Sequence, residues 1–176
     1  MKLRTAAIIT LILSAIGARL ALAGVPNVSP ITAVALFSGA YLADRKMALL
    51  VPLLAMLASD LVLGFHSTMV FVYAAFALMV GMGMWLSTRR CAQLIIAASL
   101  LASVLFFLVT NFGVWLLMDI YPMTAAGLLA SYIAAIPFFQ MTLMGDLLFT
   151  TIIFAVFMSM ERWLPGLRQQ DGQLVS

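Results

Sequence analysis

The residues best suited to chemistry in this chain are an acid and an imidazole that lie close together in apolar surroundings. The stretch SDLVLGFHST, residues 59–68, contains Asp60 and, six positions later, His66, the only histidine. Such a pair is suited to binding a polar solute or to relaying protons, since imidazole titrates near neutral pH. Either role requires the side chains to face a protein interior, because a charge exposed to lipid is costly.

Three more hydrophilic side chains interrupt long apolar runs, namely Arg19, Asn111 and Asp146. A spacing of four residues places Thr142 and Thr150 on the helix face of Asp146, which indicates a polar face turned inward. A second such face, on the preceding apolar segment, carries Ser99, Ser103, Phe107 and Asn111.

The composition predicts the surroundings of these residues. Of the 176 residues, 65% are hydrophobic and 9% are charged, whereas a soluble domain is about 25% charged. This excess of apolar side chains predicts an integral membrane protein, and the length suits about six spans of about 20 residues each. The single cysteine, Cys91, excludes an internal disulfide and a zinc site built from cysteines.

Clusters of charged and turn-forming residues divide the chain into six predicted spans. Basic residues stand beside alternate span ends, which by the positive-inside rule predicts that both termini are cytoplasmic. The predicted spans are residues 5–23, 31–43, 47–64, 68–86, about 91–110 and 141–161. We expect residues 1–163 to form a single transmembrane helical domain, followed by a polar cytoplasmic tail over residues 164–176.

The apolar block TAAGLLASYIAAIPFF, residues 124–139, does not fit this count. A third crossing between residues 91 and 161 would place Arg162 and Arg168 on the outer side, against the positive-inside rule. The block also ends beside Pro137 and follows the turn DIYP. We therefore predict an all-α fold, an integral membrane bundle of six transmembrane helices with an extra short helix at the outer face between spans five and six.

The N-terminal segment admits two interpretations. Lys2 and Arg4 precede an apolar run that ends at Ala21-Leu22-Ala23, a pattern typical of a cleaved signal peptide. The same run is long enough to remain as the first span. In either case the chain emerges on the outer side.

With this topology the hydrophilic side chains fall at a similar depth beneath the outer face. We predict a solute pocket formed by Arg19, Asp60, His66, Asn111 and Asp146, and closed by Asn27, Trp115 and Tyr121 near its outer side. The alternative is structural. In that case Arg19 pairs with Asp60 or Asp146 only to clamp helices together, and His66 is solvated in a turn.

Catalytic and nucleotide-binding motifs are missing from the sequence. No Gly-rich phosphate loop followed by Lys-Ser/Thr is present, and neither HExxH nor G-x-S-x-G occurs. We therefore expect no enzyme activity, no ATPase, no cofactor and no metal site. The basic residues lie at span ends, which indicates orientation in a membrane and not nucleic-acid binding.

Small residues recur at a spacing of four on the first predicted span, as Ser14-x-x-x-Ala18 and Gly17-x-x-x-Ala21. Such spacing lets two helices approach closely. The stripe either packs within the bundle or docks onto a partner membrane protein, and Gly81-x-Gly83 offers similar alternatives.

Four stretches carry a family resemblance, namely PNVSPITAVALFSGAYL, LVPLLAMLASDLVLGFHSTMVFVYAAFALM, LFFLVTNFGVWL and AIPFFQMTLMGDLLFTTIIF. From about Leu20 to Phe157 the chain resembles a family of bacterial inner-membrane proteins of unknown function. That family is similar in organisation to the substrate-binding S components of energy-coupling factor (ECF) transporters. The resemblance implies a six-helix bundle with a small-molecule site near the outer face. It also implies docking of Ser14, Gly17, Ala18 and Ala21 onto a transmembrane coupling subunit that carries two ATPases.

Together these observations predict a membrane-embedded substrate-binding component for uptake of a vitamin-like or other small polar solute, with no ATPase of its own. The expected partners are the solute, the lipid bilayer and, from the resemblance, the coupling subunit with its ATPases. Two rivals stay open. One is a proton-coupled carrier that uses Asp60, Asp146 and His66 as a relay, and the other is a structural or assembly protein of the inner membrane.

Overall fold

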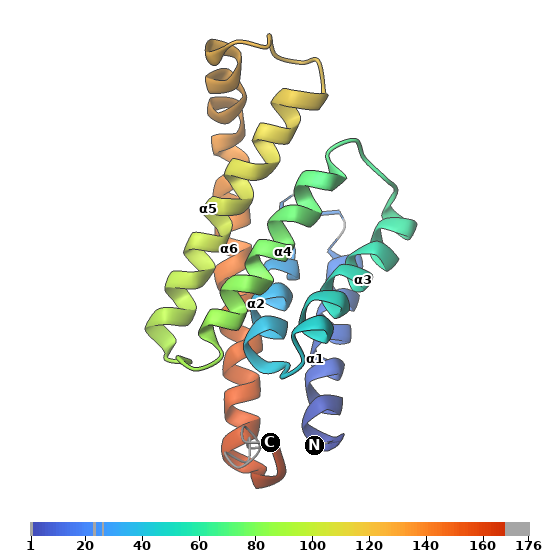
Figure 1. Ribbon diagram of the computed structural model, residues 1–176, viewed down its shortest axis with the longest axis vertical. Coiled ribbons are helices and arrows are strands. Elements are labelled where there is room, and N and C mark those ends of the chain that lie inside the picture. The colour runs from blue at the N-terminus through green and yellow to red at the C-terminus, as the bar shows by residue number, and fades with distance from the viewer. Residues whose placement is uncertain (1, 23, 26, 168–176) are drawn as a thin grey trace.

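The computed structural model describes residues 2–22, 24–25 and 27–167, and within these residues all regular structure is helical (Figure 1). The prediction of an all-α fold is therefore confirmed. The helices are α1 (Lys2–Ala21), α2 (Ile31–Tyr41), α3 (Arg45–Leu63), α4 (Met69–Leu86), α5 (Ala92–Leu117), α6 (Ala125–Trp163) and the short 3₁₀ helix η1 (Pro165–Leu167). Ala23, the last residue of the possible cleavage motif, and residues 168–176 of the predicted tail lie outside the described residues.

Helix ends follow local sequence signals. The Asp44 carboxylate accepts a hydrogen bond of 2.7 Å from the backbone N–H of Lys46 and so caps the start of α3. The Thr124 hydroxyl accepts one of 3.1 Å from the N–H of Gly127 at the start of α6. Gly64 ends α3 with a φ of 99°, a value that favours glycine.

The short helix α2 occupies the centre of the bundle, and every one of its residues is buried (Figure 1). It packs against α4, α3, α6 and α1. Its 11 residues correspond to about 16 Å at 1.5 Å per residue, which is much less than the about 30 Å of a bilayer's hydrocarbon core. Five other helices are long and apolar enough to cross a membrane. A multi-pass membrane bundle is thus supported, whereas six full spans are not confirmed.

The separate outer helix predicted over residues 124–139 does not exist as an element of its own. Those residues form the first part of α6, which runs without a break through Pro137 for 39 residues. The prediction treated Pro137 as a helix end. A proline removes only one helical hydrogen bond, however, and membrane helices tolerate it where neighbouring helices support them. Because α5 and α6 are single helices, residues 91–161 cross the bundle twice, and the charge argument is satisfied without an outer helix.

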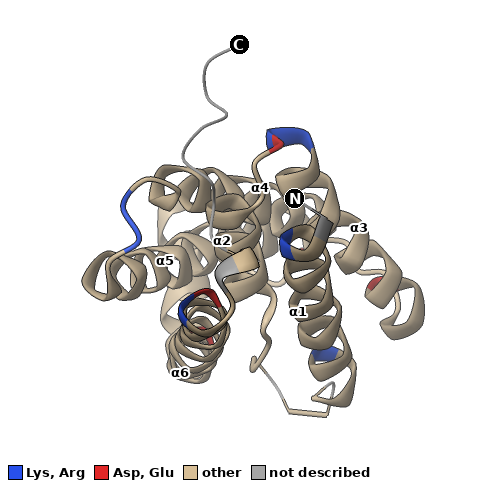
Figure 2. Ribbon diagram, turned by 90° about the horizontal axis from the view of Figure 1, so that it is seen from below, with Lys and Arg blue, Asp and Glu red and all other residues tan. Residues whose placement is uncertain are grey.

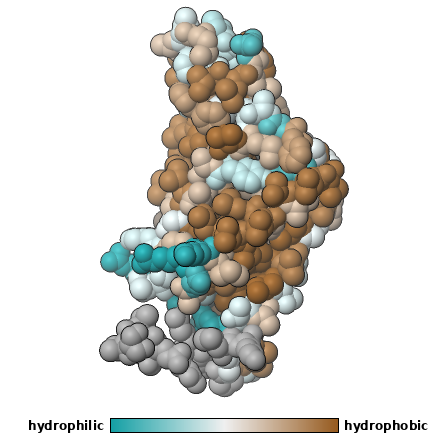
Figure 3. Space-filling view, turned by 45° about the vertical axis from the view of Figure 1, so that its right-hand side comes forward, coloured by the Kyte–Doolittle hydropathy of each residue, from teal (hydrophilic) through white to brown (hydrophobic). Residues whose placement is uncertain are grey.

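Basic residues flank the helix ends at one end of the bundle, here called the basic end, which is the lower end in Figure 1 and the end that faces the viewer in Figure 2. It carries Arg4, Arg45, Lys46, Arg89, Arg90 and Arg162, which flank the ends of α1, α3, α4 and α6 or the link to α5. At the opposite end, called the far end, α5 and α6 rise beyond the turn between α3 and α4 (Figure 1). The side of the bundle between these ends is mostly apolar (Figure 3). Large hydrophobic side chains exposed there include Leu61, Val62, Val70 and Met144, as expected for a surface that meets lipid.

Arg4 connects the start of α1 to the end of α6 and to η1. Its guanidinium donates a hydrogen bond of 2.7 Å to the Glu161 carboxylate and another to the backbone carbonyl of Leu167. It also lies 5.6 Å from the ring centre of Phe157 and 5.8 Å from that of Tyr41. The ion pair and the two cation–π contacts hold α1 against α6, η1 and the end of α2.

Two glycines set the closest helix contact of the bundle core. Gly39 of α2 faces Gly83 of α4, and both are buried. A Cβ atom on Gly39 would lie 2.7 Å from the backbone nitrogen of Met84, and one on Gly83 would lie 2.9 Å from the carbonyl carbon of Leu36. Only residues without a side chain allow the two backbones to approach this closely.

Candidate functional site

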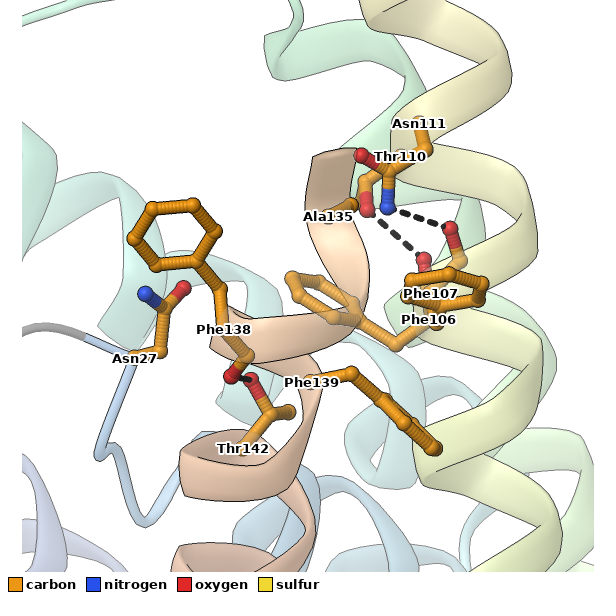
Figure 4. A pocket seen from close by; sticks show the side chains of 9 residues that line it. All are labelled: Asn27, Phe106, Phe107, Thr110, Asn111, Ala135, Phe138, Phe139 and Thr142. Atoms are coloured by element: carbon orange, nitrogen blue, oxygen red, sulfur yellow. Dashed lines mark hydrogen bonds between the residues drawn. The ribbon is translucent and has the colours of Figure 1, made fainter. Parts of the chain in front are cut away.

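A small pocket opens between α5, α6 and the segment that links α1 to α2 (Figure 4). Its volume is about 170 Å³, below the about 300–1,000 Å³ of pockets for drug-sized ligands. It is lined by Asn27, Phe106, Phe107, Thr110, Asn111, Ala135, Phe138, Phe139 and Thr142, and we call it the aromatic pocket. Four phenylalanines, two amides and two hydroxyls meet here, and no charged side chain lines it.

Helical periodicity brings these side chains together. Residues 135, 138, 139 and 142 share one face of α6, and residues 106, 107, 110 and 111 share the facing side of α5. The rings of Phe107 and Phe139 pack between the two helices with centroids 4.9 Å apart. Asn27 comes from the connecting segment, where its φ of 60° lies in the left-handed region that asparagine tolerates.

Three of the four polar side chains of the pocket donate a hydrogen bond within their own helix. Thr110 donates to the carbonyl of Phe106 at 2.8 Å, and the Asn111 amide nitrogen donates to that of Phe107 at 2.8 Å (Figure 4). Thr142 donates to the carbonyl of its own helix four residues earlier at 3.3 Å. The two threonine hydroxyl hydrogens and one amide hydrogen of Asn111 are therefore used within α5 and α6. The oxygens of the same side chains can accept hydrogen bonds from a ligand, and the second amide hydrogen of Asn111 can donate one. The arrangement suits a small solute with an apolar or ring-shaped body and polar edges.

Asp60 lies in a different cluster, together with Arg19, Ser59 and Tyr73. One guanidinium nitrogen of Arg19 donates to an Asp60 carboxylate oxygen at 2.8 Å, and another donates to the Ser59 hydroxyl. The Tyr73 hydroxyl donates to the second carboxylate oxygen at 2.9 Å. The Asp60 side chain is 3% exposed and that of Arg19 17% exposed. The cluster ties α1, α3 and α4 together, which matches the clamp offered above as the alternative to a binding role.

Asp146 lies in a third place, near the middle of α6. Its carboxylate is hydrogen-bonded to the Ser103 hydroxyl of α5 at 2.6 Å and to the Thr32 side chain of α2. One turn further along, the hydroxyls of Ser99 and Thr150 are hydrogen-bonded to each other at 3.2 Å. The prediction placed Asp146 about one turn from the outer end of its span, because the sixth span was expected to begin at residue 141.

The remaining predicted residues lie in turns or, for Trp115, in the last turn of α5. His66 is exposed in the turn between α3 and α4. The Trp115 ring nitrogen donates to the carbonyl of Pro122 at 3.0 Å and closes the turn between α5 and α6, where Tyr121 is half-buried. Of the eight predicted site residues, Asn27 and Asn111 line the aromatic pocket, whereas the others lie in the clamp, the Asp146 cluster or these turns.

Several pocket residues were not predicted. Phe138, Phe139 and Thr142 follow the spacing of one helix face with Ala135, and a helix drawn through Pro137 would have revealed that face. No sequence signal singled out Tyr73, because its hydrogen bond to Asp60 depends on how α3 and α4 pack.

The stripe of small residues on α1 faces outward. Ser14, Gly17 and Ala21 are exposed and Ala18 is half-buried. A Cβ atom on Gly17 would have no other atom within 4 Å among those considered, so this glycine is not required for packing within the bundle. The two glycines of Gly81-x-Gly83 differ in their surroundings. A Cβ atom on Gly81 would meet no other atom within 4 Å, whereas Gly83 is buried against α2.

The chain matches the profile of a protein family over nearly its whole length. The profile of a family of unknown function, DUF6580, matches residues 1–167, nearly the whole chain. No curated protein and no solved structure matches it.

Proposed function

We propose a solute-binding function for this chain, which belongs to the DUF6580 family of unknown function. The protein would be a membrane-embedded substrate-binding component for uptake of a vitamin-like or other small polar solute, similar to an ECF S component and without an ATPase of its own. The basic end would face the cytoplasm of a bacterial cell, by the positive-inside rule. The far end would then lie toward the outer side of the inner membrane.

The observation that carries this proposal is the aromatic pocket itself. It combines two amides and two hydroxyls with four phenylalanine rings, in a bundle whose side between the two ends is mostly apolar. Pockets that bind small molecules have this character, with a mainly apolar wall and a few polar groups that fix orientation. The rings would hold a planar or apolar body, while Asn27, Asn111 and the two threonines would contact its polar edges.

The substrate would be uncharged where it contacts the pocket. The described lining of the cavity contains no charged side chain, and the ion pair of Arg19 with Asp60 is already satisfied within its own cluster. A charged group brought into this pocket would lose its hydration without a counter-charge, which is strongly unfavourable. The volume of about 170 Å³ favours a ligand, or a ligand fragment, of about one or two small rings.

The test begins with identification of the ligand. We expect native mass spectrometry of the detergent-purified protein to find a small solute carried through purification, and binding of that solute to be measurable by titration. Asn27→Ala should weaken the affinity about 10-fold, the equivalent of one lost hydrogen bond of about 1.4 kcal/mol. Phe107→Ala should weaken it further, since the ring forms part of the wall.

The matched control for this test is His66→Ala. His66 is exposed in a turn and does not line the pocket, so its removal should leave the affinity unchanged. Loss of affinity in His66→Ala, with normal affinity in Asn27→Ala and Phe107→Ala, would refute the assignment of the pocket. If no solute accompanies the protein and none binds, the structural or assembly role becomes the better account.

A partner is proposed for the outward stripe of α1. Ser14, Gly17, Ala18 and Ala21 would dock onto a transmembrane coupling subunit that works with ATPases, since small residues at this spacing let helices approach closely. What supports this is the open space at Gly17 and the low burial of α1, the least buried of the five long apolar helices.

We expect Gly17→Leu to abolish co-purification of such a subunit from native membranes, while thermal stability of the isolated protein stays the same. Gly81→Leu is the control, because Gly81 is an equally open glycine on another helix. Co-purification that survives Gly17→Leu as well as it survives Gly81→Leu would contradict docking through α1.

A further inference from the structure

Asp146 is a buried acid with only hydroxyl partners. Its residue is 3% exposed, and its carboxyl group contacts the hydroxyls of Ser103 and Thr32, which are themselves buried. The ion pairs found in the described part of the chain involve Arg4 with Glu161 and Arg19 with Asp60, so Asp146 is not among them. It differs in this respect from Asp60, whose carboxylate has a guanidinium beside it.

Among the described residues, the elements packed against this part of α6 bring no charge to Asp146. Helix α5 contains no Asp, Glu, Lys, Arg or His at all, and α2 contains none either, its one titratable side chain being Tyr41 at the opposite end. The connecting segment contributes Val28 and Ser29 beside Gly145. On α6 itself, Glu161 and Arg162 are about four turns away. An ionised carboxylate here would lie in a membrane interior without a counter-ion, which is strongly unfavourable.

The geometry points to a bound proton as the missing counter-charge: we propose that Asp146 is a proton-binding site, occupied in the folded protein as a neutral carboxylic acid. The oxygen atoms of Asp146 and Ser103 are 2.6 Å apart, which lies within the range of O–H···O hydrogen bonds, including one donated by a carboxylic acid. A cation such as Ca²⁺ takes about six to eight oxygen ligands, whereas the side-chain partners found for the Asp146 carboxyl group in the described residues are the hydroxyls of Ser103 and Thr32. The carboxylate takes the proton from water and releases it to water, so no other reactant is required.

The hydroxyl of Ser103 is consistent with this state. It carries one hydrogen but lies near two acceptors, the Asp146 carboxyl oxygen and the backbone carbonyl of Ser99, the latter at 3.0 Å. If Asp146 is protonated, its O–H donates to Ser103, and Ser103 donates to the carbonyl of Ser99. Both contacts are then hydrogen bonds, whereas an ionised Asp146 would leave the single Ser103 hydrogen to serve two acceptors.

The proton site lies one helical turn below the aromatic pocket, toward the basic end. Thr142 of the pocket precedes Asp146 by four residues on α6, and Phe107 follows Ser103 by four residues on α5. Uptake or release of the proton would therefore change hydrogen bonds in the same helices that form the pocket wall. A link between proton and solute rests on the proposed function, but the proton site itself does not.

The experiment is infrared spectroscopy of the purified protein in neutral buffer. We expect wild type to show the carbonyl stretch of a protonated carboxylic acid, with the small shift in D₂O that marks an exchangeable proton. Asp146→Asn should remove this band. The control Asp60→Asn should retain it, because the Asp60 carboxylate is paired with Arg19. Ser103→Ala should retain the band at a shifted frequency, since it removes one hydrogen bond and leaves the acid.

Two results would overturn the proposal. One is a wild-type spectrum in which no carboxylic acid band is present, a result that needs no variant to fold. The other is a band that is equally strong in Asp146→Asn. A sodium site in place of the proton would show itself as thermal stabilisation of wild type by NaCl but not by choline chloride, with no such difference in Asp146→Asn. Solute binding plays no part in these measurements, so their failure is distinct from failure of the proposed function.

Discussion

Replacing Arg19 by alanine should destabilise the bundle by about 3–5 kcal/mol, the effect of removing one partner of a buried ion pair. The Asp60 side chain is 3% exposed in the intact pair, so the substitution removes the cation from beside a buried carboxylate. Tyr73 still donates one hydrogen bond to it, but a hydroxyl does not neutralise a charge. A large fall in the thermal unfolding temperature of the detergent-purified protein would report the loss.

The double variant Arg19→Ala/Asp60→Asn tests the cause. It removes the stranded charge and retains an amide that Tyr73 can still contact, so most of the lost stability should return. Asp60→Asn alone should have the smaller effect of the two single variants, because Arg19 is 17% exposed and its long side chain can reach water. Equal stability of Arg19→Ala and wild type, with no gain from the second substitution, would show that the clamp does not stabilise the bundle.

Replacing Gly83 by alanine should also be severe, although it adds a single methyl group. That group would lie 2.9 Å from the carbonyl carbon of Leu36 and 3.0 Å from the Cα of Gly39. Both neighbours are backbone atoms of α2, a helix whose residues are all buried. No side-chain rotation relieves such an overlap, so α2 and α4 must move apart, at about 3 kcal/mol or more.

The neighbouring Gly81 provides the control on the same helix. It is exposed, and a Cβ atom there meets no other atom within 4 Å. Gly81→Ala should therefore leave the unfolding temperature unchanged or raise it slightly, because alanine has the higher helix propensity. The comparison is made by fluorescence-detected thermal unfolding of both variants in one detergent. If the two substitutions had the same effect, the close approach of α2 and α4 would be refuted.

The two acids of the membrane interior illustrate how surroundings decide the role of a side chain. Asp60 has a guanidinium, a serine and a tyrosine around it and forms a clamp. Asp146 has only hydroxyl groups around it and is assigned a proton. A relay through Asp60, Asp146 and His66 is not favoured by this arrangement, because Asp60 is already paired with Arg19 and His66 is exposed in a turn.

Composition and periodicity determined the broad features of this protein. The scarcity of charge predicted a helical membrane bundle, since lipid does not satisfy the backbone polar groups that helices satisfy internally. The basic residues predicted which span ends lie together, and they do gather at one end. The four-residue spacing from Thr142 to Thr150 placed these side chains on the face of Asp146, because the helical repeat is a local property of the chain.

Only the tertiary structure decided how these faces combine. Whether Arg19 meets Asp60 or Asp146, and whether Gly81 or Gly83 touches a neighbouring backbone, depends on the rotation and offset of whole helices. The rotation and offset of a helix depend on packing among residues far apart in the sequence, so they cannot be predicted from the periodicity of that helix alone. The sequence also did not show whether Pro137 would end a helix. A proline commonly ends or kinks a helix, but Pro137 lies inside α6, where neighbouring helices support it. The expected single pocket therefore became three clusters, because residues at a similar predicted depth on different helices meet only when their faces turn toward one another.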